Sequence, residues 1–576
     1  MFKRSRKAIA VCVAMVSAVL TLPGRAQISV LTHHNDVART GQNLNEAHLT
    51  RALVNTRQFG KLFTHPLDGM VVAQPLYVPN LQVNGAKHNV VFVATLHDGI
   101  YAFDADNKTG KNASPLWYTS FIDPPKVTTV SIAEQGCPNT GFTEVGIVGT
   151  PVIDPTTNTI YLVAKTLESG TYVHRLHALD VTTGKEKFGG PVVIKGSYDS
   201  DGKEVTFHSR HRMQRPALLL SKGVIYIAFG TAGCAQDPPS AAWMMAYNAS
   251  NLKQLAVLDV GPTQQAIPGM WMAGDGPSVD SSGDVYVTTG EGVFDHNVGG
   301  LNYGDTVLKL SLGDGAFKLV DYFTPYNQAD LYAKDLDLGS SGLVVLPDQK
   351  GPYPHLGITA GKEGVIYLVN RDNLGQYNSM ADQVVQEEPF DPNRKDEIDG
   401  GATYWNNLVY FGAVGQPVKA FSLINGVLSS GPVATTAAAH YTESLFSISA
   451  NGVNNGILWG IETQDGRHSL NAFNATNLKL LYSSTQNPTR DAIDPTTHFD
   501  LPTIANGKVY LGTSDNLVVF GLLPKNTITR SNSNAGASKS INGTNPGSLL
   551  YVELHRDGCC CRTEVGSDGE VHNRRP

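Results

Sequence analysis

Charged residues and long apolar runs are both scarce in this chain. Only 16% of its 576 residues are charged and the formal net charge is −7, so nucleic acid is not expected as a partner. After residue 22, no apolar run reaches the ~20 residues that a membrane-spanning helix needs. Few segments carry apolar residues at helical spacing, whereas glycine is abundant, with 58 residues. This balance is typical of a turn-rich β protein.

The first residues have the pattern of an export signal. Basic residues at Lys3–Lys7 precede an apolar run at Ala8–Leu22, and small residues follow up to Ala26. Cleavage after Ala26 predicts a periplasmic or secreted protein, with no membrane span left in the mature chain. A membrane anchor is the alternative, although the apolar run is short for one.

One stretch recurs along the chain. In residues 99–117, Tyr101 and Phe103 alternate with small or polar side chains, as in a half-buried strand. Turn residues follow at Asp104–Gly110, and Trp117 stands at the start of the next strand, so the stretch predicts strand, turn and strand. A clear copy has Ala178-Leu-Asp180 followed by Thr183-Gly184, and weaker copies stand at Ala246–Asn248, Ala420–Ser422 and Ala472–Asn474. A loosely periodic repeat made only of strands predicts a β-propeller with one blade per repeat.

The repeat resembles the tryptophan-docking motif of pyrroloquinoline quinone (PQQ) propellers. The chain from about Asn35 to Leu523 is similar to secreted PQQ-like β-propeller repeat proteins, a fold found in quinoprotein dehydrogenases and in non-enzymatic assembly lipoproteins. We therefore expect an all-β, eight-bladed propeller of four-stranded blades, with seven blades as the alternative. The last blade lacks its outer strand, and Phe59–Leu67, with its Gly-Lys-x-x-aromatic pattern, is predicted to supply it and close the ring.

The predicted organisation has four parts. Residues 1–26 form the signal peptide, 27–58 an N-terminal extension, and 59–523 the propeller. Residues 524–576 form a flexible tail rich in Ser and Asn, which contains the run Cys559-Cys560-Cys561, to which we assign no role.

Candidate ligand-binding residues lie in loops that should open on one face of the ring. These are the loops before each innermost strand and those between the second and third strands, and they contain Arg215, Trp271, Asp275, Lys362 and Glu144. The arginine- and histidine-rich segment His208–Arg215, together with Lys362, is predicted to form a cationic wall that suits carboxylates, which PQQ carries. Trp271 offers an aromatic face for a flat ligand. The alternative, that most of these residues are solvated loop residues or turn caps and that Trp271 is ordinary loop packing, is the simpler interpretation.

Two body cysteines, Cys137 and Cys234, fall in loops on this face in neighbouring blades. In an exported protein such a pair predicts a disulfide, which would pin two long loops. His208 and His211 have no third ligand at a fixed spacing, so no metal ligand is assigned.

The resemblance implies the fold more firmly than the catalysis. Quinoprotein dehydrogenases place two adjacent cysteines against the quinone, bind calcium through a carboxylate and an Asn, and use an Asp as general base. This ring has no adjacent cysteines, and no acid can be aligned to those motifs, so no catalytic residue is assigned. The leading hypothesis is an exported binding or scaffold module for a small anionic ligand, a glycan or an envelope protein. The alternatives are a PQQ-dependent oxidoreductase of alcohols or sugars, with calcium, and a hydrolase or lyase that uses paired carboxylates.

Overall fold

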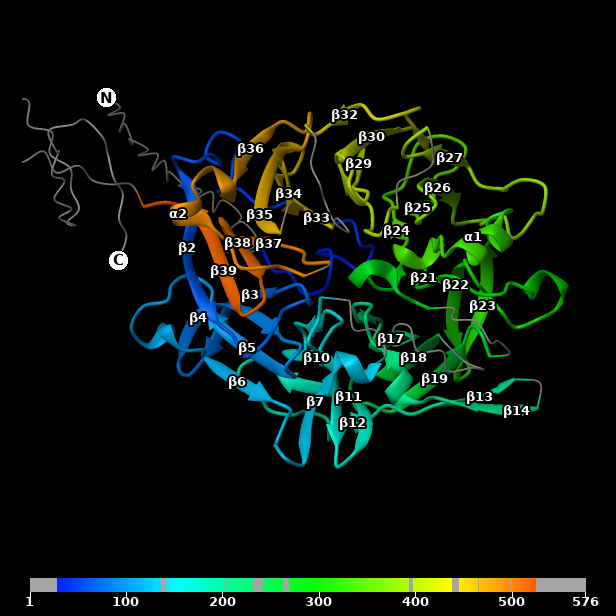
Figure 1. The fold of residues 1–576 in the computed structure, drawn as a ribbon, viewed down its shortest axis with the longest axis horizontal. Coiled ribbons are helices and arrows are strands. Elements are labelled where there is room, and N and C mark those ends of the chain that lie inside the picture. Colours follow the sequence, from blue (N-terminus) through cyan, green and yellow to red (C-terminus); the bar gives the residue numbers. More distant parts are fainter. Residues whose placement is uncertain are drawn as a thin grey trace, which may run out of the picture. The chain divides into compact units, whose positions relative to one another are not determined.

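Eight β-sheets stand around a common axis in the computed structural model of the chain (Figure 1). The structure describes residues 28–524 except 136–140, 201, 232–241, 263–268, 393–396, 438–444, 465 and 498. The predicted eight-bladed, all-β propeller is confirmed, and the seven-bladed alternative is excluded. The signal peptide, the tail with its cysteine run, and both Cys137 and Cys234 lie outside the described residues.

Within each blade, neighbouring strands pair antiparallel and are ordered outward from the axis. Blade one consists of β3 (Leu76–Val83), β4 (Ala86–Ala94), β5 (Gly99–Asp104) and β6 (Trp117–Ser120), and blade two of β9 (Val152–Asp154), β10 (Thr159–Glu168), β11 (Thr171–Asp180) and β12 (Val192–Val193). Blade three consists of β16 (Leu219–Ser221), β17 (Val224–Thr231), β18 (Trp243–Asn248) and β19 (Gln254–Asp259). Blade four consists of β20 (Ser278–Val279), β21 (Val285–Thr288), β22 (Val307–Gly313) and β23 (Ala316–Phe323).

Blades five to seven follow in the same order. Blade five consists of β24 (Val344–Val345), β25 (Leu356–Ala360), β26 (Val365–Asn370) and β27 (Gln386–Pro389). Blade six consists of β28 (Thr403–Trp405), β29 (Leu408–Phe411) and β30 (Lys419–Ile424), and the outer edge of β30 pairs with both β31 (Val427–Leu428) and β32 (Ala434–Thr435). Blade seven consists of β33 (Phe446–Asn451), β34 (Asn454–Gln464), β35 (Arg467–Asn474) and β36 (Leu480–Ser483).

Short elements decorate the blades. The strands β7 (Val127–Ser131) and β8 (Glu144–Val145) extend blade two, β15 (Arg212–Met213) pairs with β17, and β13 (Ser197–Ser200) and β14 (Lys203–Thr206) form a separate hairpin. The helices are α1 (Gln328–Lys334), α2 (Pro488–Asp491) and the 3-10 turns η1 (Gly110–Ala113), η2 (Ile132–Gln135), η3 (Ser209–His211), η4 (Met272–Gly274), η5 (His296–Val298), η6 (Leu338–Ser340) and η7 (Ser484–Gln486). No helix in the part of the chain described has the length and apolar character to cross a membrane.

The repeat motif docks one blade onto the next. The Trp117 indole Nε1 donates a hydrogen bond to the Val181 carbonyl of blade two, at 2.9 Å. Its ring lies against Gly184, where an added Cβ would stand 2.6 Å from Trp117 Cε3, and Gly184 has a φ of +68°. The Thr-Gly turn of the motif is therefore the surface that receives the preceding blade's tryptophan.

The last blade is closed by the N-terminal part of the chain, as predicted. It consists of β37 (Thr503–Ala505), β38 (Lys508–Gly512), β39 (Asn516–Leu522) and, outermost, β2 (Phe59–Pro66). The register runs from Phe59 opposite Leu522 to Pro66 opposite Asn516, and Figure 1 shows blue β2 beside orange β39. This pairing joins the two ends of the repeat array and removes an open sheet edge at the seam.

Residues 30–43, which we call the axial plug, reach the innermost edge of every blade. The hydrogen bonds join Val30 to Tyr77, Leu31 to Ile153, Arg39 to Leu218, Val37 to Val279, Ala38 to Val345, Thr40 to Tyr404, Gly41 to Ile448 and Asn43 to Ile504. At its end, β1 (Gln42–Asn43) pairs parallel with β33 of blade seven. A segment bonded to all eight blades lies along the axis, so the predicted N-terminal extension is an integral part of the ring.

Candidate functional site

Loops of blades four and five bring a group of carboxylates together. Glu291 follows β21, Asp335 and Asp337 precede β24, and oxygen atoms of these three side chains lie within 4.8 Å of one another. Lys362, which follows β25, places its Nζ 2.7 Å from Asp337 Oδ2 and 3.3 Å from Asp335 Oδ1. The Glu291 backbone N–H also donates to Asp337 Oδ1, at 2.6 Å. The cluster therefore holds more acidic groups than basic ones.

Burial and mutual repulsion give Glu291 and Asp337 very different pKa values. Burial, with the Asp337 carboxylate beside it, raises the pKa of Glu291 to about 11. Burial alone would raise the pKa of Asp337 too, but its hydrogen bonds with Glu291 and the Lys362 ammonium lower it. At neutral pH, Asp337 is therefore an ionised acceptor, and Glu291 holds a proton unless a cation takes its place.

Trp271 lies on a floor of glycines next to this cluster. An added Cβ would come within 2.1 Å of its indole at Gly269, 2.6 Å at Gly230 and 3.2 Å at Gly290. The same Cβ at Gly290 would stand 2.6 Å from Asp337 Oδ1, so Trp271 and Asp337 flank one glycine. A side chain at any of these positions would crowd the indole, so glycine lets the backbone approach the half-buried Trp271 ring closely.

Arg215 extends the arrangement into blade three. Its guanidinium carbon lies 5.9 Å from the Trp271 ring centroid and 3.8 Å from that of Phe499. Arg215, Trp271, Asp337 and Lys362 thus form one continuous series of neighbours, which we call the mouth arc. Three of the five residues predicted from the sequence, Arg215, Trp271 and Lys362, belong to it.

The other two predicted residues lie in separate clusters. Glu144 accepts a hydrogen bond from His97 Nδ1 at 3.0 Å, in the loops of blades one and two. Asp275 is fully buried and contacts His33 and His34 of the axial plug. Asp335, His33 and His34 were not among the candidates, because nothing in the local sequence marks them as partners of residues far along the chain.

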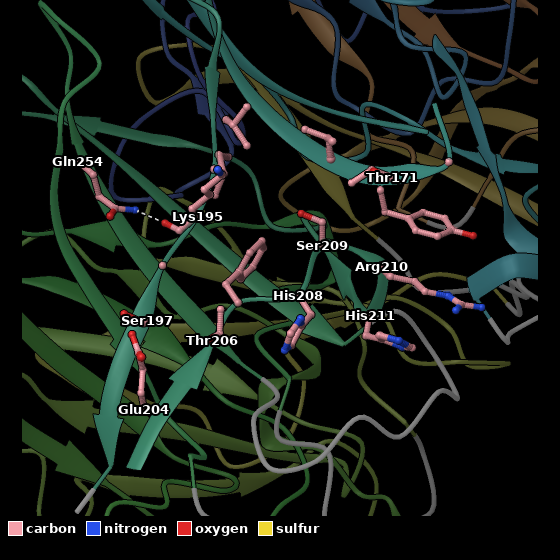
Figure 2. Close-up of a pocket in the computed structure, with 17 residues that line it drawn as sticks. Thr171, Lys195, Ser197, Glu204, Thr206, His208, Ser209, Arg210, His211 and Gln254 are labelled. Carbon is pink, nitrogen blue, oxygen red and sulfur yellow. Dashed lines mark hydrogen bonds between the residues drawn. The ribbon is translucent and has the colours of Figure 1, made fainter. Parts of the chain in front are cut away.

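The segment His208–Arg215 divides instead of forming one wall with Lys362. His208, Arg210 and His211 line a groove with a volume of about 1160 Å³, between β11, β12 and the β13–β14 hairpin (Figure 2). Arg212 is buried, and Arg215 joins the mouth arc. Across the groove, Gln254 donates to the Lys195 carbonyl at 2.6 Å (Figure 2). This groove is a second concave surface, and its ionisable lining residues are mainly basic.

The chain was compared with known proteins at the levels of sequence and structure. No protein-family model and no curated protein matches it. Among solved structures, a quinohemoprotein alcohol dehydrogenase from Comamonas testosteroni is 15% identical, with a TM-score of 0.56 over 86% of this chain and 80% of that chain. One from Pseudomonas putida HK5 is 11% identical, with a TM-score of 0.54 over 92% and 84%. A europium-containing methanol dehydrogenase is 11% identical, with a TM-score of 0.54 over 86% and 98%.

These matches establish the class of fold. The chain has the propeller architecture found in quinohemoprotein alcohol dehydrogenases, as the repeat motif implied. At such low identity the likeness concerns the fold alone, so function has to be argued from the mouth arc.

Proposed function

We propose that the protein is a quinone-dependent oxidoreductase that acts on hydroxyl groups of alcohols or sugars. The observation that carries the proposal is the mouth arc, in which Arg215, Trp271, Asp337 and Lys362 are successive neighbours. A binding or scaffold role does not require a buried carboxylate held ionised beside an aromatic platform. Solved structures of the same fold are described as alcohol and methanol dehydrogenases, which supports the enzyme over the scaffold.

The residues present fit a flat, anionic quinone such as PQQ. The Trp271 indole is braced by glycine backbone and can stack on a planar ring system. Arg215 presents a planar fork of donors that matches a carboxylate. The ring carries no adjacent cysteine pair, so on this chain Trp271 alone would form the platform.

The same region fits a hard divalent cation such as Ca²⁺. Glu291 and Asp335, beside Asp337, supply oxygen ligands, which Ca²⁺ prefers. Glu291 Oε2 is buried and has no hydrogen-bond partner among the described residues. A bound cation would replace the proton on Glu291, so its affinity should rise with pH.

A bound quinone would supply the two-electron acceptor for oxidation of a hydroxyl to a carbonyl. Asp337 is the group in the arc that we assign to accept the hydroxyl proton, because Glu291 and the Lys362 ammonium keep it ionised at neutral pH. Lys362, at 2.7 Å, fixes the orientation of that carboxylate. The predicted signal peptide would place this activity in the periplasm or outside the cell.

The test is to reconstitute purified protein with PQQ and CaCl₂ and to follow dye reduction with alcohols and sugars. We expect turnover only when both are added. Asp337→Asn should lower kcat by about 10²–10⁴-fold, which is the usual contribution of a general base. The variant should retain the quinone absorbance. Asp314→Asn, at an exposed turn of blade four, is the matched control and should keep full activity.

Two results would contradict the proposal at different levels. If the protein neither retains PQQ nor reduces the dye, the enzyme is excluded and the binding module predicted from the sequence becomes the better hypothesis. If turnover occurs but Asp337→Asn matches Asp314→Asn, the oxidoreductase stands and the assignment of Asp337 is wrong.

A further inference from the structure

Two histidines of the axial plug meet one carboxylate of blade four inside the ring. His33 Nδ1 and His34 Nδ1 each lie 3.2 Å from Asp275 Oδ1. The exposed fractions of these residues are 1%, 0% and 0%. Within the part of the chain described, neither nitrogen and neither carboxylate oxygen makes a hydrogen bond. Buried polar atoms are normally satisfied, so four unsatisfied ones in one cluster require an explanation.

The orientation of His34 adds a constraint on protons. Its Nε2 lies 2.9 Å from the Phe446 carbonyl, which can only accept, so Nε2 carries a hydrogen. In a neutral ring, Nδ1 then presents a lone pair to the Asp275 carboxylate. Two lone pairs at 3.2 Å repel unless a cation or a further proton lies between them. A metal-ligating histidine usually donates its other ring N–H to a carbonyl or carboxylate, and His34 Nε2 makes such a bond to the Phe446 carbonyl.

The spacing of the atoms suits a common metal ion. Donor atoms bonded to one ion at about 2.0–2.2 Å lie roughly 2.8–3.6 Å apart for bond angles between octahedral and tetrahedral. Both observed nitrogen–oxygen separations, 3.2 Å, fall within this interval. The three ligand atoms all lie within 4.8 Å of one another.

From this geometry we propose that His33, His34 and Asp275 bind a divalent transition metal of the zinc class at the axis of the propeller. Two imidazoles and one carboxylate form a mixed nitrogen and oxygen set that suits Zn²⁺ or Co²⁺ better than Ca²⁺. The three residues are fully buried, so the role of the ion is structural and it fastens the plug to blade four. It is distinct from the carboxylate cluster of the mouth arc.

The surrounding residues hold this geometry in place. Arg39 donates to Thr32 Oγ1 and to the carbonyls of His33, Leu218 and Pro277, and its charge interacts with the Asp275 carboxylate. The backbone turns sharply at His34 and Asn35, both with left-handed φ values of 55° and 68°. Such residues persist only when their surroundings fix them, and here the turn brings both imidazoles to one side.

Asp275 also ties the ion to the mouth arc. It follows η4, and Trp271 stands directly before that turn. An added Cβ at Gly401 would come 1.7 Å from Asp275 Oδ2, so the carboxylate is held against the backbone of blade six. Fixing Asp275 therefore fixes the loop that carries the aromatic platform.

Metal content of the full-length protein tests the proposal. The chain is produced without a polyhistidine tag and with Cys559→Ser, Cys560→Ser and Cys561→Ser, so that tail thiolates cannot bind the ion. We expect about one transition-metal ion per chain by mass spectrometry, as for a preformed closed site. His33→Ala and Asp275→Asn should lose it, whereas His355→Ala, a surface histidine paired with Asp372, should keep it.

A second measurement covers the case in which the variants do not fold. Wild-type protein stripped with a chelator and reloaded with Co²⁺ should show visible d–d absorption without thiolate charge-transfer bands, and its melting temperature should fall on stripping and recover on reloading. Glu291→Gln should leave this spectrum unchanged, because it acts on the other site. A wild-type chain without metal, without a Co²⁺ spectrum and insensitive to the chelator would overturn the proposal in favour of a His34–Asp275 ion pair.

Discussion

Replacing Phe59 by alanine should weaken the seam of the ring. The Phe59 side chain is fully buried between blades seven and eight. Its ring lies 5.4 Å from that of Trp459, 4.9 Å from that of Tyr482 in an edge-on contact, and 6.2 Å from that of Phe520. Phe59→Ala therefore removes the aromatic contacts that the N-terminal strand makes with blade seven and with Phe520 of its own blade.

The expected loss in free energy of unfolding is about 3–5 kcal/mol, the range for deleting a buried Phe side chain. Because 1.4 kcal/mol corresponds to a tenfold change in an equilibrium constant, the unfolded population should rise by roughly two to four orders of magnitude. Urea denaturation followed by both circular dichroism and fluorescence measures this, and coincident curves would support one cooperative transition. Phe63→Ala is the control, because Phe63 lies on the same strand and is only half-buried. A loss below about 1 kcal/mol, or one no larger than for Phe63→Ala, would refute closure at Phe59 as a main source of stability.

Two further predictions concern buried basic groups. Arg39→Met removes the donor to the buried carbonyls of His33, Leu218 and Pro277. The free energy of unfolding measured by denaturation should therefore fall by about 3–5 kcal/mol. An unchanged denaturation midpoint would contradict the bonding role of Arg39. Burial lowers the pKa of His65 to about 4. Because unfolded histidine binds a proton below about 6.5 and the folded one does not until about 4, stability should fall as pH drops through this window, by up to about 3 kcal/mol from His65. His65→Phe should flatten that dependence between pH 7 and 4.5, and an equally steep loss in the variant would show that His65 does not contribute.

Local patterns accounted for the ring. The alternation in residues 99–104, the turn that follows, and Trp117 are all readable within twenty residues, and the structure builds β5, β6 and the docking contact from them. The closing strand was also predictable, because Phe59–Pro66 resembles the outer strand that blade eight lacks. Propeller geometry then places Trp271 and Lys362 in loops of one face without any knowledge of their contacts.

The axial plug could not be read in the same way. Its residues make hydrogen bonds to every blade, and their partners lie up to 461 residues away, as for Asn43 and Ile504. A segment bonded to eight different strands has no periodicity of its own. For the same reason Asp275 was expected at an open mouth, whereas His33 and His34 enclose it. Its ligands come from the part of the chain with the least regular sequence.

The filled axis changes how a ligand at the mouth would act on the rest of the ring. The loop from Gly269 to Asp275 has Trp271 at the mouth arc and Asp275 at the plug, within five residues. A ligand that stacks on Trp271 restrains this loop, and so does any ion held by Asp275. Binding of the ligand should therefore cost less conformational entropy when the ion is already bound, and the same holds for the ion when the ligand is bound. The coupling free energy must be equal in both directions. PQQ affinity measured with and without the axial ion should differ by the same factor as ion affinity measured with and without PQQ, and two independent affinities would show that the loop does not couple the sites.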